Sequence, residues 1–398
     1  MEIKQKEFFL FCILRIFIRF MKSPRSIAIV HDWLVGMRGG EKVLEVVCEL
    51  FPDAVLWTLV HQKGNLSPTI ESMDIRTSFI QKIPFGRHKY QYFLPLYPAA
   101  IRKFDLQEFD LIISISHAAA KAVRPRKDVL HICYCHTPMR YIWDQYDDYF
   151  GKGKSSFVAR TAMKMCVEYL RRWDIESVNG VDYFIANSNN VQERIRRIYR
   201  RDSTVMYPPV DVDRFSVSNK DSGYYLIVSA LVPYKRIDLA IEAFNELGER
   251  LVIIGTGEER KRLQVGARSN IEFLGWVDDD RLAEYYAGCR ALIFPGEEDF
   301  GIVPLEAMAS GKPVIAFAKG GALETVVDGK TGILFSEQTR ESLMGAVQRF
   351  TQMTFDGTAI RSHVERFDRK LFKEQLLLYI QERWGKYHPM SARRLASK

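Results

Sequence analysis

The sequence lacks the features that mark several specialised classes of protein. No stretch reaches the roughly 18 to 20 unbroken apolar residues of a membrane-spanning helix, which excludes an integral protein with several spans. Only six cysteines are scattered over 398 residues, which indicates a reduced, cytoplasmic protein rather than a disulfide framework. The basic excess is small, 57 Lys+Arg against 49 Asp+Glu. A net charge of +8 is too small to indicate a nucleic-acid-binding protein, but it is compatible with an acidic ligand or an anionic membrane surface.

The composition is that of an ordinary globular protein, with 47% hydrophobic and 27% charged residues. A chain of 398 residues is long enough for two domains, since compact domains usually hold roughly 100 to 200 residues. There is no internal repeat and no low-complexity tract. We therefore expect two domains, each with its own core.

The N-terminal extension, residues 1–25, carries an apolar run at residues 8–20, FFLFCILRIFIRF, with Arg15 and Arg19 one helical turn apart. The run is too short to span a bilayer, and no small-residue cleavage site follows it. Two interpretations stay open. The segment is an interfacial anchor, or translation begins at Met21 and the segment is not part of the working protein.

From residue 26 onward, apolar β-branched runs alternate with segments of helical period, which predicts an α/β fold of parallel sheets covered on both faces. The pattern restarts after Pro208-Pro209, which predicts a second doubly wound domain beyond a stiff hinge. Ligands of such sheets lie beyond the carboxyl ends of the strands. We predict a first domain at 26–208, a second at 209–370, and a C-terminal helix and tail at 371–398.

The strongest motif is PGEEDFGIVPLEAMASG at residues 295–311. A strand ends at Pro295, and we expect a helix to begin at Pro304, with Glu306 in its first turn. Free backbone N–H groups and the helix dipole at this point favour a diphosphate. Glu306 can accept hydrogen bonds from a vicinal diol, and Glu298 on the loop can bind further hydroxyls. Alternatively, both glutamates are only helix-start acids.

The spacing of these glutamates, E-x7-E within EDFGIVPLEAMASGKPVIAFAKGG, resembles the donor site of retaining glycosyltransferases of family 4, which have the GT-B fold. The resemblance covers about residues 27–335. It is also carried by SALVPYKRIDLAIEAF (229–244), LVIIGTGEER (251–260), FLGWVDDDRLAEYYAGCRALIFP (273–295), YCHTPMRYIWD (134–144) and NSNNVQERI (187–195).

The resemblance implies roles for individual residues. Glu306 would bind the nucleotide ribose, Glu298 the donor sugar, and Lys235 the diphosphate, with Arg236 beside it. The family usually carries Arg where this chain has Ala230. One cation of the usual pair is therefore absent, and Arg236 is a candidate to replace it. The backbone amides near the donor would come from Phe300, Gly301 and Ile302.

In the first domain, Gly39 and Gly40 follow the first strand and let a ligand approach the backbone, or form a simple tight turn. The resemblance favours the former, because the family's glycine loop lines the cleft. His136 follows a strand and matches the family's active-site histidine. His117 is a weaker candidate for the acceptor side, and His31 is weaker still.

Two sets of residues could be mistaken for metal ligands. His131, Cys133 and Cys135 alternate onto one face of a strand, but no second cluster exists, which favours buried core residues. The aspartates at 278–280 directly precede a helix, where aspartate serves as a cap. We expect no metal and no other cofactor.

Residues 85–104, FGRHKYQYFLPLYPAAIRKF, interleave basic and aromatic residues, as is typical of a surface that meets lipid headgroups. Five arginines between residues 194 and 201 add a basic stripe, although a solvated charged face explains this stripe equally well. Together they favour a peripheral enzyme at the inner face of the plasma membrane.

The amino-acid sequences of these motifs further resemble those of bacterial mannosyltransferases of O-antigen and other surface polysaccharides. The expected function is therefore the transfer of a hexose, with GDP-mannose as the favoured donor, to a glycan acceptor that is lipid-linked. Two alternatives remain. One is a nucleotide-sugar-binding protein without transferase activity, suggested by Ala230, and the other is a GT-B epimerase that acts on a nucleotide sugar.

Overall fold

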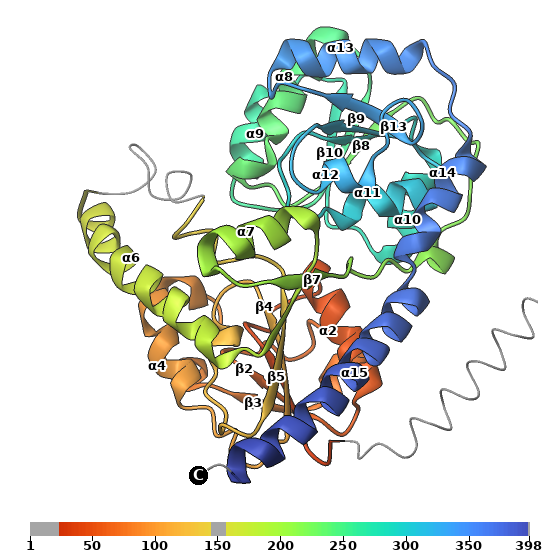
Figure 1. Cartoon of the computed structure of the whole chain (residues 1–398). Coiled ribbons are helices and arrows are strands. Elements are labelled where there is room, and N and C mark those ends of the chain that lie inside the picture. The colour runs from red at the N-terminus through yellow and green to blue at the C-terminus, as the bar shows by residue number, and fades with distance from the viewer. Residues whose placement is uncertain (1–23, 145–156, 397–398) are drawn as a thin grey trace, which may run out of the picture.

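The computed structural model describes residues 24–144 and 157–396, which form two α/β domains (Figure 1). The apolar segment at residues 8–20 lies outside the described residues. No helix in the described ranges is long and apolar enough to cross a bilayer.

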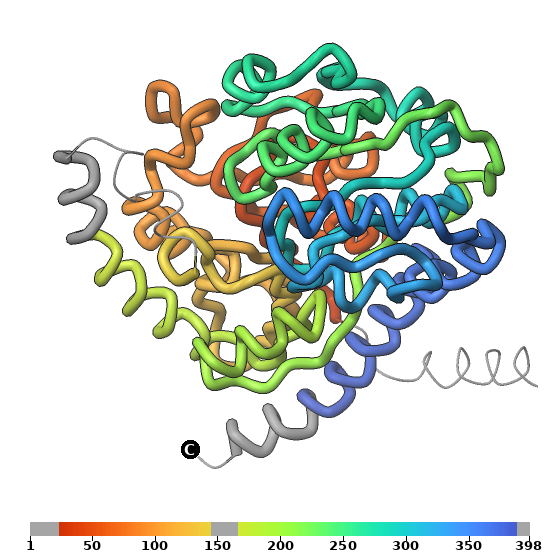
Figure 2. Tube along the Cα trace, turned by 90° about the horizontal axis from the view of Figure 1, so that it is seen from above, coloured from red at the N-terminus to blue at the C-terminus, as the bar shows by residue number. Residues whose placement is uncertain are grey.

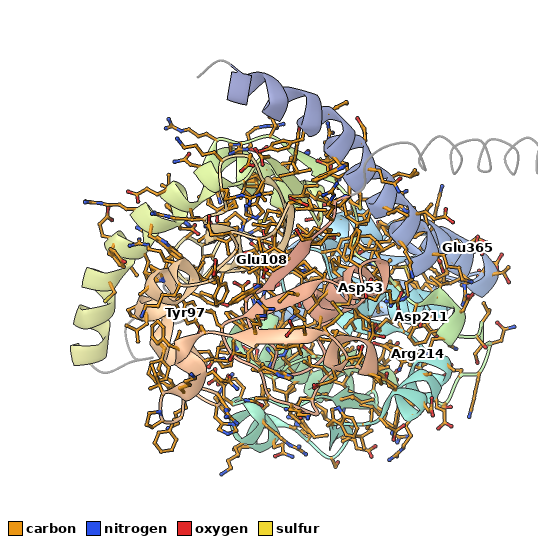
Figure 3. All side chains as sticks on the ribbon, turned by 90° about the horizontal axis from the view of Figure 1, so that it is seen from below. Asp53, Tyr97, Glu108, Asp211, Arg214 and Glu365 are labelled. Atoms are coloured by element: carbon orange, nitrogen blue, oxygen red, sulfur yellow. The ribbon has the colours of Figure 1, made fainter. Side chains whose placement is uncertain are left out.

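The first domain is built on a seven-stranded parallel sheet with the order β3-β2-β1-β4-β5-β6-β7. Its central strands are apolar and fully buried because helices cover both faces of a parallel sheet. Tyr97, labelled in Figure 3, is buried in this domain and donates its hydroxyl to the carbonyl of Tyr90 at 3.0 Å. The elements are β1 (Ile27–His31), α2 (Gly39–Leu50), β2 (Val55–Thr58), α3 (Pro68–Glu71), β3 (Asp74–Thr77), α4 (Tyr97–Arg102), β4 (Leu111–Ser116), β5 (Leu130–Cys135), α6 (Phe157–Ser177), β6 (Tyr183–Ala186), α7 (Asn189–Tyr199) and β7 (Ser203–Val205).

The second domain holds a six-stranded parallel sheet with the order β10-β9-β8-β11-β12-β13. In both sheets the strand order reverses beside the first strand of the domain, as in doubly wound folds. The elements are β8 (Tyr225–Val228), α8 (Ile237–Leu247), β9 (Leu251–Ile254), α9 (Arg260–Gly266), β10 (Ile271–Gly275), α10 (Asp279–Gly288), β11 (Leu292–Phe294), α11 (Ile302–Ala309), β12 (Val314–Phe317), α12 (Ala322–Thr325), β13 (Gly332–Phe335), α13 (Arg340–Thr351), α14 (Gly357–Val364) and α15 (Arg369–Ala396).

The last helix, α15, leaves the second domain and runs back along the first, as Figures 1 and 2 show. Its apolar side chains join the core cluster beneath β1, β4 and β5, and Arg369 at its start pairs with Glu49 of α2 at 2.6 Å. The segment that leads into the second domain and the segment that leads back to α15 lie side by side. The N–H of Val210 donates to the carbonyl of Phe367 at 3.0 Å, and the N–H of Arg369 donates to the carbonyl of Val210 at 2.9 Å.

The predicted fold class, two doubly wound parallel sheets, is confirmed. The first sheet ends at Val205 and the second begins at Tyr225. The boundary between 208 and 209 stays a prediction.

Candidate active site

The loop between β11 and α11 carries the strongest sequence motif. Gly301 has φ +85°, a left-handed conformation that favours glycine, and α11 begins directly after it at Ile302. The prediction that Pro304 starts this helix is therefore wrong, because Pro304 is its third residue. Glu306 accordingly lies in the second turn and not in the first. The free N–H groups at the helix start belong to the segment that follows Glu298, where an anion would be stabilised.

Glu298 and Lys235 are in direct contact across this loop, the ammonium of one against the carboxylate of the other. Lys235 ends a short 3-10 turn after β8, Pro233–Lys235. The loop packs closely against this turn at Gly296, because a Cβ added to Gly296 would lie only 2.9 Å from the Cα of Lys235. The carbonyl of Glu298 accepts a hydrogen bond from the N–H of Gly321 at 2.8 Å, which fixes the other side of the loop.

Burial and, to a smaller extent, the neighbouring guanidinium of Arg140 together lower the pKa of Lys235 to about 7, while Asp299 opposes them. The ion pair with Glu298 also favours the charged form. Lys235 therefore holds a proton that the local environment makes easy to lose, and an anionic ligand would retain it.

Glu306 is only 8% exposed and lies on the second domain's side of the cleft. The hydroxyl of Tyr286, on α10, donates to one carboxylate oxygen at 2.8 Å. The ammonium of Lys42, on α2 of the first domain, lies 3.6 Å from the other oxygen. Glu306 is thus held at the boundary between the domains.

Two further predicted donor residues have other contacts. The ring of Phe300 is buried and stacks on Tyr207 at 5.4 Å, so only its backbone is available to a donor. Arg236 has φ +52°, and its guanidinium binds Asp238 at 3.3 Å and Gln338 at 3.1 Å. Arg236 reaches the loop only through Gln338, whose amide donates to the carbonyl of Pro295 at 2.9 Å.

The two predicted glycines lie where the domains meet. A Cβ on Gly39 would lie 3.2 Å from the side chain of Ile302, at the start of α11. A Cβ on Gly40 would lie 3.4 Å from Nε2 of His136. The start of α2 therefore brings the predicted histidine of the first domain and the predicted helix of the second to one place. A larger residue at position 39 would crowd Ile302, and one at position 40 would press on His136.

His136 follows β5 at the carboxyl end of the first sheet. Its Nε2 atom is buried and has no hydrogen-bond partner among the described residues. Burial lowers its pKa to about 3, and the nearby imidazoles of His117 and His31 add to this effect. The ring is neutral at pH 7 and is available to a ligand hydroxyl.

His117 lies beside His136, with ring centroids 6.3 Å apart. Its Nδ1 is 3.2 Å from Asp32, a fully buried carboxylate directly after β1. Burial raises the pKa of Asp32, but His117, His31 and backbone N–H groups outweigh it and leave the pKa below its usual value. Those N–H groups belong to residues 117–120 and lie 2.5 to 3.0 Å from the carboxylate.

The residues set aside as metal candidates have structural roles. His131 is buried and bonded through Nε2 to Ser114 at 2.8 Å and through Nδ1 to the carbonyl of Gly180 at 2.8 Å. Asp278 caps α10 by accepting from the N–H of Arg281 at 2.9 Å. Within the described ranges, no group of three or more His, Cys, Asp and Glu side chains is arranged to hold a metal ion.

Three arginines of the stripe, which lies on α7 and just after it, are engaged within the molecule. Arg194 pairs with Asp144 and, at 2.5 Å, with Asp299, Arg197 also pairs with Asp144, and Arg201 binds backbone carbonyls. The stripe therefore offers little support for a membrane surface.

Sequence reasoning missed several residues of the cleft. Arg140 and Arg194 of the first domain both bind Asp299, next to Glu298 in the loop. Asp32, Lys42 and Tyr286 were missed as well. A polar residue directly after a core strand, as in the HDW segment, was the one signal that could have indicated Asp32.

Two family models match adjoining parts of the chain. One, described as Glycosyltransferase Family 4, matches residues 58–214. The other, described as Glycosyl transferases group 1, matches residues 211–361. The two matches meet where the chain passes from the first sheet to the second. Together they cover residues 58–361, so that each of the two domains matches a glycosyltransferase model.

The individual relatives match part of the chain. The chain is 30% identical over 167 residues to an uncharacterized glycosyltransferase of Methanocaldococcus jannaschii, covering 41% of this chain and 47% of that one. It is 26% identical over 211 residues to the alpha-1,3/1,6-mannosyltransferase ALG2 of Dictyostelium discoideum, covering 40% and 50%. The matched segments thus span about half the length of these relatives.

Among solved structures, the chain resembles the Anabaena protein HepE in complex with UDP and glucose, with a TM-score of 0.68 and 17% identity. The alignment covers 90% of this chain and 100% of that one. At this identity the likeness shows the fold, which is the GT-B arrangement of two Rossmann-like domains.

Proposed function

We propose that the protein is a retaining glycosyltransferase that moves a hexose from a nucleotide diphosphate sugar to a hydroxyl of a glycan acceptor. The observation that carries the proposal is that three features lie where the two domains meet. These are the Lys235–Glu298 contact, Glu306 at the domain boundary, and the unpartnered Nε2 of His136. The first two suit a diphosphate and a ribose, and the third suits a sugar hydroxyl.

The proposed step is a front-face displacement. The acceptor oxygen forms a bond to the anomeric carbon on the side from which the diphosphate leaves, so the configuration is retained. The departing diphosphate oxygen takes the proton of the acceptor hydroxyl. The protein supplies orientation and charge stabilisation through Lys235, the amides of Phe300, Gly301 and Ile302, and the start of α11. No protein nucleophile and no metal is required by this route.

GDP-mannose is the donor that we favour. The support is the resemblance of the motifs to bacterial surface-polysaccharide mannosyltransferases and the partial match to a mannosyltransferase. Nothing in the described contacts selects the base or the hexose. His117, beside His136 and held by Asp32, is the candidate for binding the acceptor.

We further propose that the acceptor is lipid-linked and that the protein works at an anionic membrane surface inside the cell. The support comes from residues 85–104, where Phe85 is 72% and Tyr92 is 80% exposed, beside exposed Arg87 and Lys89. Aromatic rings and cations so placed suit lipid headgroups. Cosedimentation with vesicles of anionic and of neutral lipid tests this, and equal binding of a Phe85→Ser, Tyr92→Ser variant would contradict it.

The main experiment is product analysis with a panel of nucleotide sugars, with and without a lipid-linked acceptor. We expect acceptor-dependent release of the nucleoside diphosphate and a product of retained configuration. Thermal stabilisation by a nucleotide sugar without turnover would identify a binding protein instead. Release of a free altered sugar without acceptor would identify an epimerase.

A further inference from the structure

The donor site has one cation fewer than its family resemblance predicts. Ala230 stands where arginine is usual, and Arg236, the sequence candidate for its replacement, is bound to Asp238 and Gln338. A diphosphate carries two negative charges, and one lysine balances only one of them. The backbone amides and the start of α11 supply part of the balance, and a second cation from another part of the molecule would complete it.

Arg140 of the first domain reaches this place from across the cleft. It lies in the loop after β5, four residues beyond His136, and its guanidinium contacts the carboxylate of Asp299. Asp299 directly follows Glu298, which contacts Lys235. Lys235 and Arg140 thus bind neighbouring carboxylates of one loop.

The environment of Arg140 is that of an oriented binding group and not of a surface ion pair. Its side chain is only 13% exposed. Its Nε–H is buried and finds no acceptor within residues 24–144 and 157–396. An unpaired buried donor is costly unless something satisfies it. The planar guanidinium is suited to binding phosphate oxygens with several N–H groups at once.

We infer that Arg140 binds the donor diphosphate together with Lys235 and replaces the cation that is absent at position 230. This inference rests on the proposed function. Because Arg140 belongs to the first domain, the diphosphate would be bound by cations from both domains.

The alternative is that Arg140 only holds the domains together through Asp299. The two roles predict opposite effects for Asp299→Asn. Because Asp299 also helps Lys235 to keep its proton, the comparison is made below about pH 6, where Lys235 is charged. If Arg140 binds the diphosphate, removing the competing carboxylate then leaves donor affinity unchanged or raises it. If Arg140 only links the two domains through Asp299, Asp299→Asn weakens donor binding as much as Arg140→Gln does. Asp299 keeps Arg194 as a partner in the Arg140→Gln variant, so that variant does not strand a buried carboxylate.

The test is calorimetric titration of the full chain with the nucleotide sugar that it turns over, with the nucleoside diphosphate, and with the nucleoside. Arg140→Gln should weaken the first two by about 10- to 100-fold, as expected for lost charge-assisted hydrogen bonds. Binding of the nucleoside should not change. Ala230 is exposed and can accept a larger side chain, so Ala230→Arg in the Arg140→Gln background should recover most of the loss.

The matched control is Arg369→Gln, which removes a partly buried arginine that pairs with Glu45 and Glu49 away from the loop. It should leave donor affinity unchanged. Each of three results would overturn this inference alone. They are an unaltered donor affinity in Arg140→Gln, equal losses of affinity in Arg140→Gln and Asp299→Asn, and no recovery of affinity by Ala230→Arg. If the unaltered protein binds no nucleotide sugar, the proposed function fails and this inference fails with it.

Discussion

The two sides of the cleft treat their polar groups differently. On the second domain, the charged groups are already paired: Lys235 with Glu298, Glu306 with Tyr286 and Lys42, and Asp299 with two arginines. On the first domain, Nε2 of His136 is buried without a hydrogen-bond partner in the described part of the chain, and Nε2 of His31 lies 3.5 Å from a carboxylate oxygen of Glu41. The charged groups of the loop are thus paired, whereas a ring nitrogen of His136 is not.

The difference indicates how each side responds to a ligand. A charged ligand on the second domain must exchange existing ion pairs for new ones, so affinity depends on the balance of charges. A hydroxyl ligand on the first domain fills hydrogen bonds that are unmade in the free protein. We therefore expect substitutions on the second domain to change donor binding, and also turnover where the residue contacts the transferred sugar, while those among the histidines change turnover and stability.

The largest expected effect is that of Glu298→Ala, because Glu298 is both the proposed contact to the donor sugar and the partner of Lys235. We expect turnover to fall by about 100-fold or more, with a smaller change in donor affinity. Steady-state kinetics with separate donor titration checks this. The control is Glu297→Ala, since Glu297 pairs at the surface with Lys319 at 3.0 Å. Equal turnover in both variants would remove Glu298 from the mechanism.

Glu306→Ala should come next, with donor affinity lowered by about 10- to 100-fold through loss of charge-assisted hydrogen bonds to the ribose. Tyr286→Phe keeps the carboxylate but removes the hydroxyl that orients it, so the loss should be smaller. Calorimetric titration with the nucleotide sugar measures both. A larger loss for Tyr286→Phe than for Glu306→Ala would show that the carboxylate does not bind the donor.

Donor affinity should also fall as pH rises, because the Lys235 pKa of about 7 lies well below the ordinary value of 10.5. The ammonium is present below pH 7 and is lost above it, whereas the diphosphate of a nucleotide sugar stays charged throughout. We expect about a tenfold loss of affinity from pH 6 to pH 8. Lys235→Arg should flatten the profile, since arginine stays charged. A flat profile in the unaltered protein would contradict this assignment.

The smallest expected effect concerns stability on the histidine side. His136→Leu removes a buried nitrogen that lacks a partner, so we expect the free energy of unfolding to rise by up to about 1 kcal/mol, while transfer is lost. His131→Leu is the control, because both nitrogens of His131 are bonded. That variant should lose about 1–3 kcal/mol. Thermal unfolding of both proteins decides, and a destabilised His136→Leu would show that His136 is a structural residue.

Much of the fold could be predicted from the sequence because its signals are local. Apolar runs between helical segments predict two parallel sheets, and the restart after Pro209 separates them. The extent of α11 was less predictable. Pro304 suits a first helical position, but Gly301 adopts a left-handed conformation that lets the helix begin two residues earlier. Local preference was overridden by the conformation of the preceding loop.

The candidate site was only partly predictable. The E-x7-E spacing and Lys235 are short-range patterns, and the structure brings Glu298 and Lys235 into contact. Arg236 also lies in the motif, but its backbone turns the side chain toward Asp238 and Gln338. Arg140 and Asp299 are far apart along the chain, so no local pattern links them.

The sequence by itself determined the two α/β domains, the loop-helix motif with its two glutamates, and the motif that carries Lys235, because each depends on neighbouring residues. Only the tertiary structure decided which first-domain side chains face that loop. Packing of the two sheets placed Lys42, Arg140 and Arg194 against second-domain carboxylates. The tertiary structure also buried Nε2 of His136 without a hydrogen-bond partner among the described residues. Charge pairing across a cleft depends on distances in space, which the order of residues in a chain does not specify.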